Sequence, residues 1–487
     1  MAGVIAAACL FLFGLAPGER ALGLIPEDLR ILPGVREVTA VPVAPGRLAA
    51  DSAVHVDLTA GIPPVGNQGA QGSCVAWAFG YNLKTQFEYR RRGWNVNEPQ
   101  HQFSPAFLYN QINGGVDGGT GGSRAMALMA EAGCANMVDC PYNQYDYTSW
   151  PSESAYRRAM EFRTGFPSYV WAGDTAGVNR ARQHVANGYS FVLGIQVWSN
   201  FDNIHHFNNT YCSSERYGTM RGWHAVTVVG YDDTLTTSDG PGAFRVVNSW
   251  GTGWGDNGFF WMSYVAVMDE MMGGRQAEFP ADRVGYEPAL VGWVRINHSS
   301  RERIGLRLGV GTPGMSFWHH DFRTFRWPRA HVAFPDRLIG FDLTDGASSL
   351  RGLPTDSIYL EVIDDSLDGR HGFIEAFSAE HLEWGTLGSS GDPPVFIPDN
   401  GIYVWATLHL PMTGVEQMPD VECRMTNGPT VMRSPGLARF GGRVFDMQGR
   451  DVTDRRAALA PGVYFTQEGS RGRGFERSRV RKVVLTE

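Results

Sequence analysis

Cysteine is scarce in this chain, with six residues among 487. The sequence has no CxxC pair and no run of closely spaced histidines and cysteines, so structural zinc is not indicated. Cys134 and Cys140 lie close enough in sequence to close a short loop, but their spacing does not prove a disulfide. If Cys9 is removed with an N-terminal signal, five cysteines remain, so at least one thiol is expected to be unpaired.

Long apolar runs are also missing. No segment reaches about 18 consecutive apolar residues, so we expect no stable membrane span. The apolar run at residues 4–16 is too short to cross a bilayer and is followed by Pro17 and Gly18. This pattern is typical of a cleaved secretory signal, expected at residues 1–20, although basic residues are absent from its start. A lipoprotein anchor at Cys9 is the poorer alternative, because Cys9 lies too near the start.

Positive charge is in the minority, with 42 Lys and Arg against 50 Asp and Glu, which argues against a general nucleic-acid-binding role. The exception is the stretch from Arg433 onward, which is basic. We interpret it as a small basic domain; a tail that binds nucleic acid or an anionic surface is the alternative. The 43% hydrophobic and 19% charged content is typical of a globular protein, and the length predicts two to four domains.

The middle of the chain predicts an α+β domain at residues 51–284, preceded by a short pro-segment or extended arm at 21–50. Ser73 is a candidate N-cap for a helix that begins at Cys74 and runs to Arg92. A second helix is expected at 123–132, and strands are expected at 191–198, 225–231, 244–250 and 259–264. Helices that come first and strands that come later favour α+β over alternating βαβ units.

The remainder of the chain predicts all-β structure. Short strand-like runs separated by turn residues indicate a β-sandwich accessory domain at 285–412. Residues 413–435 are interpreted as a linker and 436–487 as a small β domain, with a hairpin turn at Gln448 and Gly449.

One cysteine has a distinctive setting, in the stretch QGAQGSCVAWAF at residues 68–79. A helix N-terminus stabilises a thiolate, and Cys74 directly follows the expected N-cap. His224 heads one predicted strand and Asn248 ends the next, so the two side chains share a sheet edge if these strands pair. The side chain of Gln68 and the backbone N–H of Cys74 are candidate donors to an oxyanion. Taken singly, a buried cysteine, a structural histidine and a turn asparagine are the ordinary interpretations; the combination points to nucleophilic catalysis.

The blocks QGAQGSCVAWAF, GWHAVTVVGY and NSWGTGWGDNGFF resemble the three signature blocks of papain-like cysteine peptidases, in the family's order. The resemblance covers roughly residues 51–264 and implies a helical half and a β-barrel-like half, with no metal or organic cofactor. It also implies the role of each motif residue: Cys74 as nucleophile, His224 as general base and acid, Asn248 as the residue that orients His224, Gln68 as oxyanion donor, Trp250 as a shield over the His–Asn hydrogen bond, and Gly121 and Gly122 as binders of substrate backbone.

The sequence departs from the family at several points. Gln71 stands where the family usually has a cysteine, so that disulfide is absent, and Trp223 stands where the plant enzymes often have Asp. Cys134 and Tyr142 fall near the family's Pro-Tyr segment. Residues 21–50 are too few for the long inhibitory pro-helix, so any zymogen control is expected to work differently.

The C-terminal segments resemble two further modules. Residues 285–412 are similar to a P-domain-like β-sandwich; the acidic turn from Asp364 to Glu375 also fits EF-hand spacing, so calcium at this turn is a less favoured alternative. The tail resembles the C-terminal sorting domain of bacterial type nine secretion, which implies that secretion machinery as a partner. An ordinary immunoglobulin-like module is the alternative for the tail.

We therefore expect a bacterial cysteine endopeptidase, secreted or held at the cell surface, that hydrolyses protein or peptide substrates through an acyl-enzyme. The alternative from another class is a non-catalytic adhesin or binding protein on a peptidase scaffold. A substrate cleft blocked by the 21–50 arm would favour that alternative. A transpeptidase or exopeptidase on the same fold is a third possibility.

Overall fold

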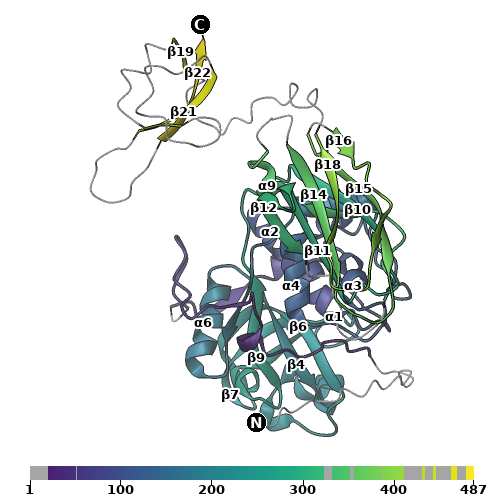
Figure 1. The fold of residues 1–487 in the computed structure, drawn as a ribbon. Coiled ribbons are helices and arrows are strands. Elements are labelled where there is room, and N and C mark those ends of the chain that lie inside the picture. The colour runs from purple at the N-terminus through teal and green to yellow at the C-terminus, as the bar shows by residue number, and fades with distance from the viewer. Residues whose placement is uncertain are drawn as a thin grey trace, which may run out of the picture. The chain divides into compact units, whose positions relative to one another are not determined.

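The computed structural model describes residues 20–410 except 51, 323–331, 351–355 and 384, together with four strands beyond residue 429. The chain divides into two compact units, Met1–Glu416 and Gln417–Glu487, and Figure 1 traces both. The expected signal at residues 1–20 lies outside the described residues, apart from Arg20.

The predicted helix behind Cys74 is present as one continuous helical run. It consists of α1 (Cys74–Ala76), the π-helical stretch η3 (Trp77–Lys84) and α2 (Thr85–Arg92). It ends where predicted because Gly93 takes a left-handed conformation, with a φ of 65°. Ser73 occupies the N-cap position as predicted, but its side chain makes no cap hydrogen bond; its Oγ lies 2.8 Å from the hydroxyl oxygen of Tyr142 instead.

The other helices of this unit are shorter, and several lie away from the central run (Figure 1). The helix predicted at 123–132 is α4 (Gly122–Glu131), with a buried face of Ala and Met residues. The remaining α-helices are α3 (Pro105–Ile112), α5 (Glu153–Met160), α6 (Thr175–Ala186), α7 (Ser199–Asp202), α8 (Tyr264–Met268) and α9 (Thr344–Ala347). The 3-10 turns are η1 (Leu29–Ile31), η2 (Thr59–Gly61), η4 (Pro99–His101), η5 (Ile204–Phe207) and η6 (Ser213–Glu215).

A nine-stranded sheet forms the β-rich part of the α+β domain. In sheet order its strands are β1 (Arg36–Glu37), β3 (Pro167–Trp171), β9 (Gly273–Pro280), β4 (Phe191–Val197), β6 (Gly222–Thr237), β7 (Gly240–Val247), β8 (Phe259–Ser263) and β5 (Thr210–Tyr211), with β2 (His55–Asp57) on β6. The four strands predicted from the sequence are β4, β6, β7 and β8. Strands β6 and β7 are antiparallel neighbours, with Thr227 opposite Val247, as the argument for His224 and Asn248 requires.

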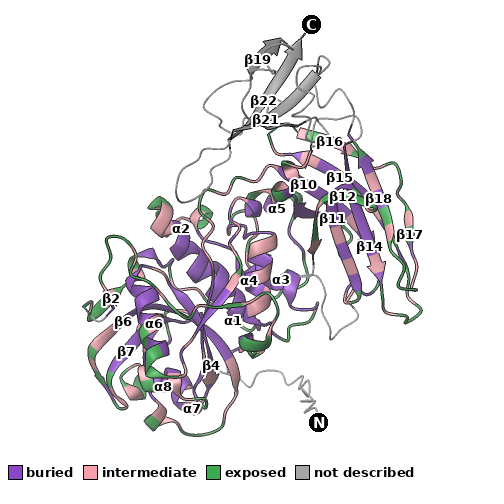
Figure 2. Cartoon of the chain, turned by 60° about the vertical axis from the view of Figure 1, so that its left-hand side comes forward, coloured by how far each residue is buried: buried purple, intermediate pink, exposed green. Residues whose placement is uncertain are grey.

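The strands between residues 290 and 409 form two further antiparallel sheets. One contains β13 (Ile339–Asp342), β10 (Leu290–Asn297), β15 (Gly372–His381) and β16 (Gly385–Ser389), with β17 (Val395–Ile397) on β15; the other contains β12 (Met315–Phe322), β11 (Ile304–Thr312), β14 (Ser357–Asp364) and β18 (Val404–His409). The sheets face one another, because a methyl group at Gly292 would lie 2.8 Å from a side-chain carbon of Leu308. Their buried residues run along both sheets in Figure 2. Strands, rather than EF-hand helices, flank the acidic turn that begins at Asp364.

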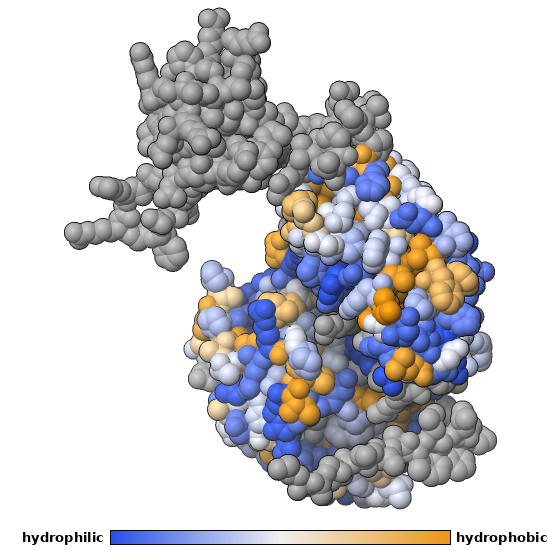
Figure 3. Space-filling view, in the orientation of Figure 1, coloured by the Kyte–Doolittle hydropathy of each residue, from blue (hydrophilic) through white to orange (hydrophobic). Residues whose placement is uncertain are grey.

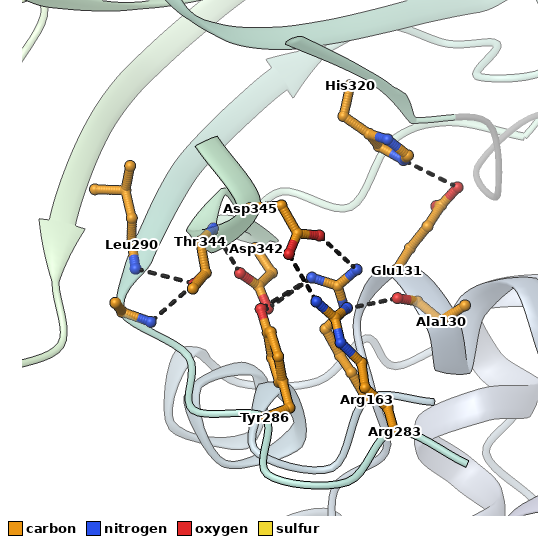
Figure 4. Close-up of polar contacts among 11 residues, drawn as sticks. Ala130, Glu131, Arg163, Arg283, Tyr286, Leu290, His320, Asp342, Thr344 and Asp345 are labelled. Carbon is orange, nitrogen blue, oxygen red and sulfur yellow. Dashed lines mark hydrogen bonds and ion pairs between the residues drawn. The ribbon is translucent and has the colours of Figure 1, made fainter. Parts of the chain in front are cut away.

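Charged side chains join these sheets to the α+β domain (Figure 4). Arg163 Nη1 lies 3.0 Å from Asp342 Oδ2, and the Asp342 side chain is fully buried. Arg163 Nε also donates to the carbonyl of Ala130 at the end of α4, while Arg283 pairs with Asp345. Because buried charges are costly unless they are paired, this network fixes the accessory sheets against the helices.

The second unit contains a four-stranded sheet in the order β19 (Thr430–Arg433), β22 (Arg479–Thr486), β21 (Gly462–Glu468), β20 (Arg443–Phe445). Strand β19 falls inside the predicted linker 413–435, so that prediction is wrong over residues 430–433. The segment was missed because a four-residue strand that pairs with a distant partner gives little local signal. The turn predicted at Gln448 and Gly449 lies outside the described residues.

The described surface mixes polar and apolar side chains in small groups (Figure 3). Within the described ranges, no helix is long and apolar enough to cross a membrane.

Candidate active site

Cys74 begins the long helical run and is completely buried. The backbone N–H of Ala225, in β6, faces its sulfur, so the thiol lies beside the strand that carries His224. The structure therefore brings together the first two residues that the sequence singled out, although 150 positions separate them.

His224 and Asn248 meet at the edge shared by β6 and β7. The distance from His224 Nε2 to Asn248 Oδ1 is 2.7 Å, and Asn248 Oδ1 also accepts from the backbone N–H of Ser249. Because this oxygen can only accept, the proton of the neutral imidazole belongs on Nε2. His224 Nδ1 is buried without a hydrogen-bond partner and is left as the acceptor. This tautomer suits a base that takes a proton from a thiol.

Trp250 covers the histidine. Its ring centroid lies 4.8 Å from that of His224, with the two rings inclined by 33°. Trp250 is buried, and Phe201 packs against both rings. This apolar cover lies where the sequence predicts a shield, and it keeps water from competing for the His224–Asn248 hydrogen bond.

Gln68 is fully buried beside the helix start, and its side-chain amide is oriented by Ser249. Ser249 Oγ donates to Gln68 Oε1 at 2.6 Å, which turns Gln68 Nε2 the other way. Gln68 Nε2 then donates to the backbone carbonyl of Ala21 at 3.2 Å and to that of Gln71 at 2.9 Å. The amide predicted to stabilise an oxyanion thus contacts a carbonyl oxygen of the N-terminal arm.

The arm itself fills the cleft over Cys74. Trp250 Nε1 joins Gln68 in donating to the Ala21 carbonyl, at 3.3 Å. The backbone N–H of Gly23 faces the Cys74 sulfur. Gly23 can lie there because it has no side chain; a methyl group would sit 1.8 Å from the carbonyl oxygen of Gly72. Cys74 therefore meets an amide N–H of the arm rather than a carbonyl carbon that it could attack.

Further along the arm, backbone hydrogen bonds continue on both sides of the cleft. Thr120 N–H donates to the Gly23 carbonyl and Ile25 N–H donates to the Thr120 carbonyl, both at 2.9 Å, while Leu24 N–H donates to the Trp223 carbonyl at 3.3 Å. From Leu29 onward the arm belongs to the domain, since Leu29 is buried and β1 pairs with β3. Residues 20–27 are hereafter called the cleft segment.

The glycine pair lies against the cleft segment without bonding to its backbone. The Glu27 carboxylate accepts from the N–H of Ser123 at 3.0 Å and lies against Gly121. Gly122 faces the carboxyl group of Glu278, on β9. On this side of the cleft, the backbone bonds of the cleft segment go instead to Thr120, one position before the pair identified from the sequence.

Burial favours the neutral forms of Cys74 and His224 in this closed arrangement. It raises the pKa of the Cys74 thiol to about 12, against the opposing effect of the N–H groups of Ala225 and Gly23. Burial lowers the pKa of His224 to about 4, although the hydrogen bond to Asn248 favours the charged ring. A thiolate–imidazolium pair requires solvent or substrate polar groups that the cleft segment now excludes.

Several residues support the site in ways that the sequence argument did not predict. The Tyr142 hydroxyl donates to the Gln68 carbonyl at 2.8 Å and contacts Ser73. Tyr142 therefore holds both ends of the loop from Gln68 to Ser73, which lies beside the predicted oxyanion site. Ser249, which orients the side chain of Gln68, was given no role from the sequence. The side chain of Gln71 reaches the carbonyls of Asn143, Gln144 and Asp146, and so ties down a loop without a disulfide.

The described cysteines are free thiols: Cys74, Cys134, Cys140 and Cys212. No group of three or more metal-ligating side chains occurs among the residues that the structure describes.

Residues 53–273 match the family model described as papain family cysteine protease. Gamete and mating-type specific protein A of Dictyostelium discoideum is 27% identical over 208 residues, which cover 43% of this chain and 42% of that protein. Cathepsin B-like CP3 of Giardia intestinalis is 26% identical over 213 residues, which cover 41% of this chain and 64% of that protein. The chain thus spans less than two thirds of the length of either curated relative. Xylellain, a cysteine protease from Xylella fastidiosa, is 23% identical with a TM-score of 0.43, over 54% of this chain and 97% of that structure.

Proposed function

We propose that the protein is an endopeptidase in which Cys74 is the nucleophile. The basis is the papain-family cysteine protease domain at residues 53–273, which makes the protein a cysteine-type peptidase. The single observation that carries this proposal is the convergence of Cys74, His224 with its free Nδ1, and Asn248 at one buried edge. The structure then represents a closed form, in which the cleft segment takes the place of substrate.

The proposed reaction is acyl transfer. Once the cleft segment leaves, His224 Nδ1 takes the thiol proton, and the Cys74 thiolate attacks the carbonyl carbon of a peptide bond. The side-chain amide of Gln68 and the Cys74 N–H stabilise the oxyanion, as Gln68 now binds the Ala21 carbonyl. His224 returns its proton to the leaving amine and then activates a water molecule that releases the acyl group.

The blocked cleft also bears on the rival proposal of a non-catalytic binding protein. We favour a latent enzyme because the cleft segment engages the donors that catalysis needs and leaves the His224–Asn248 hydrogen bond intact. A binding protein has no requirement for these groups.

We also propose that the protein is secreted or held at the cell surface of a bacterium. Residues 285–412 would then be a P-domain-like accessory domain and the tail a type nine sorting domain. The basis of this proposal is the sequence resemblance of the two segments to those modules.

The test is cleavage of unfolded casein by the full chain under reducing conditions. Gly23→Ala opens the cleft, and Gly23→Ala with Cys74→Ala is the matched control. We expect internal peptides from the first variant only. Amino acids or dipeptides alone would indicate an exopeptidase, joined peptides a transpeptidase, and no cleavage by either variant a binding protein.

A further inference from the structure

A cavity lies where the arm, the helix α4 and the accessory sheets meet, and its volume is about 730 Å³. Residues 32–35 of the arm form one wall, Ala127 and Ala130 of α4 form another, and His320 of β12 closes a third side. Figure 4 shows His320 reaching across from β12 toward Glu131 on α4, and the two side chains are 3.8 Å apart. Ligand pockets commonly have volumes of about 300–1,000 Å³ and often lie between domains, so this cavity has the size and the place of a binding site.

The wall of the cavity is mostly apolar. Its apolar side chains come from the arm, from α4 and from the loop before β3: Leu32, Pro33, Val35, Ala127, Ala130, Phe166 and Pro167. Two charged side chains in the wall are already paired, Arg163 with Asp342 at 3.0 Å and Arg283 with Asp345 at 2.6 Å (Figure 4). Because these charges are satisfied within the protein, the wall favours an uncharged, apolar ligand over an ionic one.

Thr164 adds a hydrogen-bonding group to this wall. It is 1% exposed, and its hydroxyl oxygen has no hydrogen-bond partner. Its backbone N–H donates to the carbonyl of Met129 at 3.0 Å, which fixes its position beside α4. A buried hydroxyl without a partner is costly, and a ligand that brings an N–H or a C=O group supplies the missing bond. A peptide segment brings both groups together with apolar side chains.

The cavity begins where the cleft segment ends. Glu27, the last residue of the cleft segment, belongs to the lining together with Ser123, whose N–H donates to the Glu27 carboxylate at 3.0 Å. The same carboxylate lies against Gly121, inside the cleft. A polypeptide that replaces the cleft segment therefore has a direct path past Gly121 and Ser123 into the cavity.

We propose that this cavity is an exosite, a second binding site for the protein substrate, which takes a run of apolar residues several positions away from the scissile bond. The inference rests on the proposed function, because it adds a binding site to the same peptidase. The accessory sheets take part in substrate binding through His320, which closes the cavity. The exosite directs the enzyme toward unfolded proteins with apolar stretches and away from short or polar peptides.

The experiment uses the full chain with Gly23→Ala, so that the cleft is open. One cleavable core peptide is compared with the same peptide extended at either end by a short run of Leu and Val, or of Ser and Asn. We expect the apolar extension at one end to raise kcat/KM by on the order of tenfold, and the polar extension to change it little. The ratio between two peptides is independent of the fraction of active enzyme in a preparation.

Two substitutions place this gain at the cavity. Ala127→Trp fills the cavity and should bring the gain close to one, whereas Ala333→Trp, at an exposed position outside the lining, should preserve it. Thr164→Val keeps the shape of the side chain and should reduce the gain severalfold, because the hydrogen bond to the extension is lost. A gain that survives both Ala127→Trp and Thr164→Val, or the same kcat/KM with and without the apolar extension, would overturn the inference.

Binding separates this inference from the proposed function. The core peptide and its apolar extension are titrated calorimetrically into the Gly23→Ala, Cys74→Ala variant, with and without Ala127→Trp. Tighter binding of the extended peptide that disappears with Ala127→Trp would support the exosite even if no variant cleaved peptide. Equal affinity for the two peptides would overturn the exosite even if cleavage by Cys74 were established.

Discussion

Gly23→Ala is the substitution that most sharply tests whether the cleft segment holds the enzyme closed. The added methyl group would lie 1.8, 2.3 and 2.7 Å from the carbonyl oxygen, carbonyl carbon and Cα of Gly72. Gly72 cannot retreat easily, because its N–H donates to Asp117 Oδ1 at 2.8 Å. The added methyl group therefore clashes with backbone atoms that cannot easily move aside, and the closed position of the cleft segment is destabilised.

The size of the effect follows from what holds Ala21 to Ile25 in place. Five hydrogen bonds join these residues to Gln68, Trp250, Thr120 and Trp223, and each has a net value of about 1 kcal/mol. Overpacking of a tight site costs about 1–3 kcal/mol, and a clash of a methyl group with backbone atoms belongs at the upper end. A destabilisation of about 3 kcal/mol raises the open population roughly 100-fold.

The assay is the rate of alkylation of Cys74 by iodoacetamide in the full chain at pH 7.5, followed by peptide mass mapping. Gly23→Ala should alkylate roughly 100-fold faster than the parent. Gly391→Ala is the matched control, because a methyl group there has no neighbour within 4 Å. Equal alkylation rates for the parent and Gly23→Ala would refute the claim that the cleft segment limits access.

Four further predictions concern the groups around the cleft and the domain junction. Gln68→Ala in the Gly23→Ala background should lower kcat by on the order of 100-fold, because an oxyanion donor is lost. In the otherwise unaltered chain, the same substitution should speed alkylation of Cys74, because the Ala21 carbonyl loses a donor. A fall in both the cleavage rate and the alkylation rate would contradict the dual role of Gln68. Trp250→Phe keeps the ring over His224 but loses the N–H that binds Ala21, so alkylation of the full chain should rise about fivefold with peptide cleavage in the open form little changed. Opening of the cleft should increase with pH, because the closed form holds a proton on Glu278 up to its raised pKa of about 8 and the open form releases that proton at lower pH. Hydrogen exchange of residues 20–27, corrected for intrinsic rates, should therefore accelerate from pH 5 to 8. Glu278→Gln should remove this pH dependence of opening. Asp342→Asn leaves the charge of Arg163 without its buried partner and should lower the free energy of unfolding in urea by roughly 3 kcal/mol, with an unchanged value contradicting a structural role for the junction.

The sequence predicted the parts of the site that depend on local signals. The helix from Cys74 to Arg92 follows from its apolar spacing and ends at Gly93, whose conformation favours glycine. The neighbouring positions of His224 and Asn248 follow from two consecutive strands with strong β-forming runs, which pair as a hairpin. These features need only short-range information, and they were sufficient to place His224 near Asn248; that Cys74 joins them was implied by the resemblance to the family.

The parts that the sequence did not predict depend on contacts between distant segments. Gly23 looks like any loop glycine until its carbonyl and N–H are placed against Thr120 and Cys74. Ser73 has the residue type of an N-cap, but its hydroxyl is drawn to Tyr142 instead. Glu278 alternates with apolar residues along β9, and only the fold shows that it faces a cavity walled by glycines.

The central claim is that Cys74 forms an acyl-enzyme, and a rapid-quench mass measurement tests it most directly. The Gly23→Ala chain is mixed with an activated peptide ester, quenched in acid within the first turnover and digested at low pH. The account predicts that the peptide carrying Cys74 gains the mass of the acyl group, and that neither His224→Ala nor Cys74→Ala in the same background forms this adduct. Hydrolysis of the ester with no adduct on Cys74, or an adduct on Cys140 or another thiol, would contradict it.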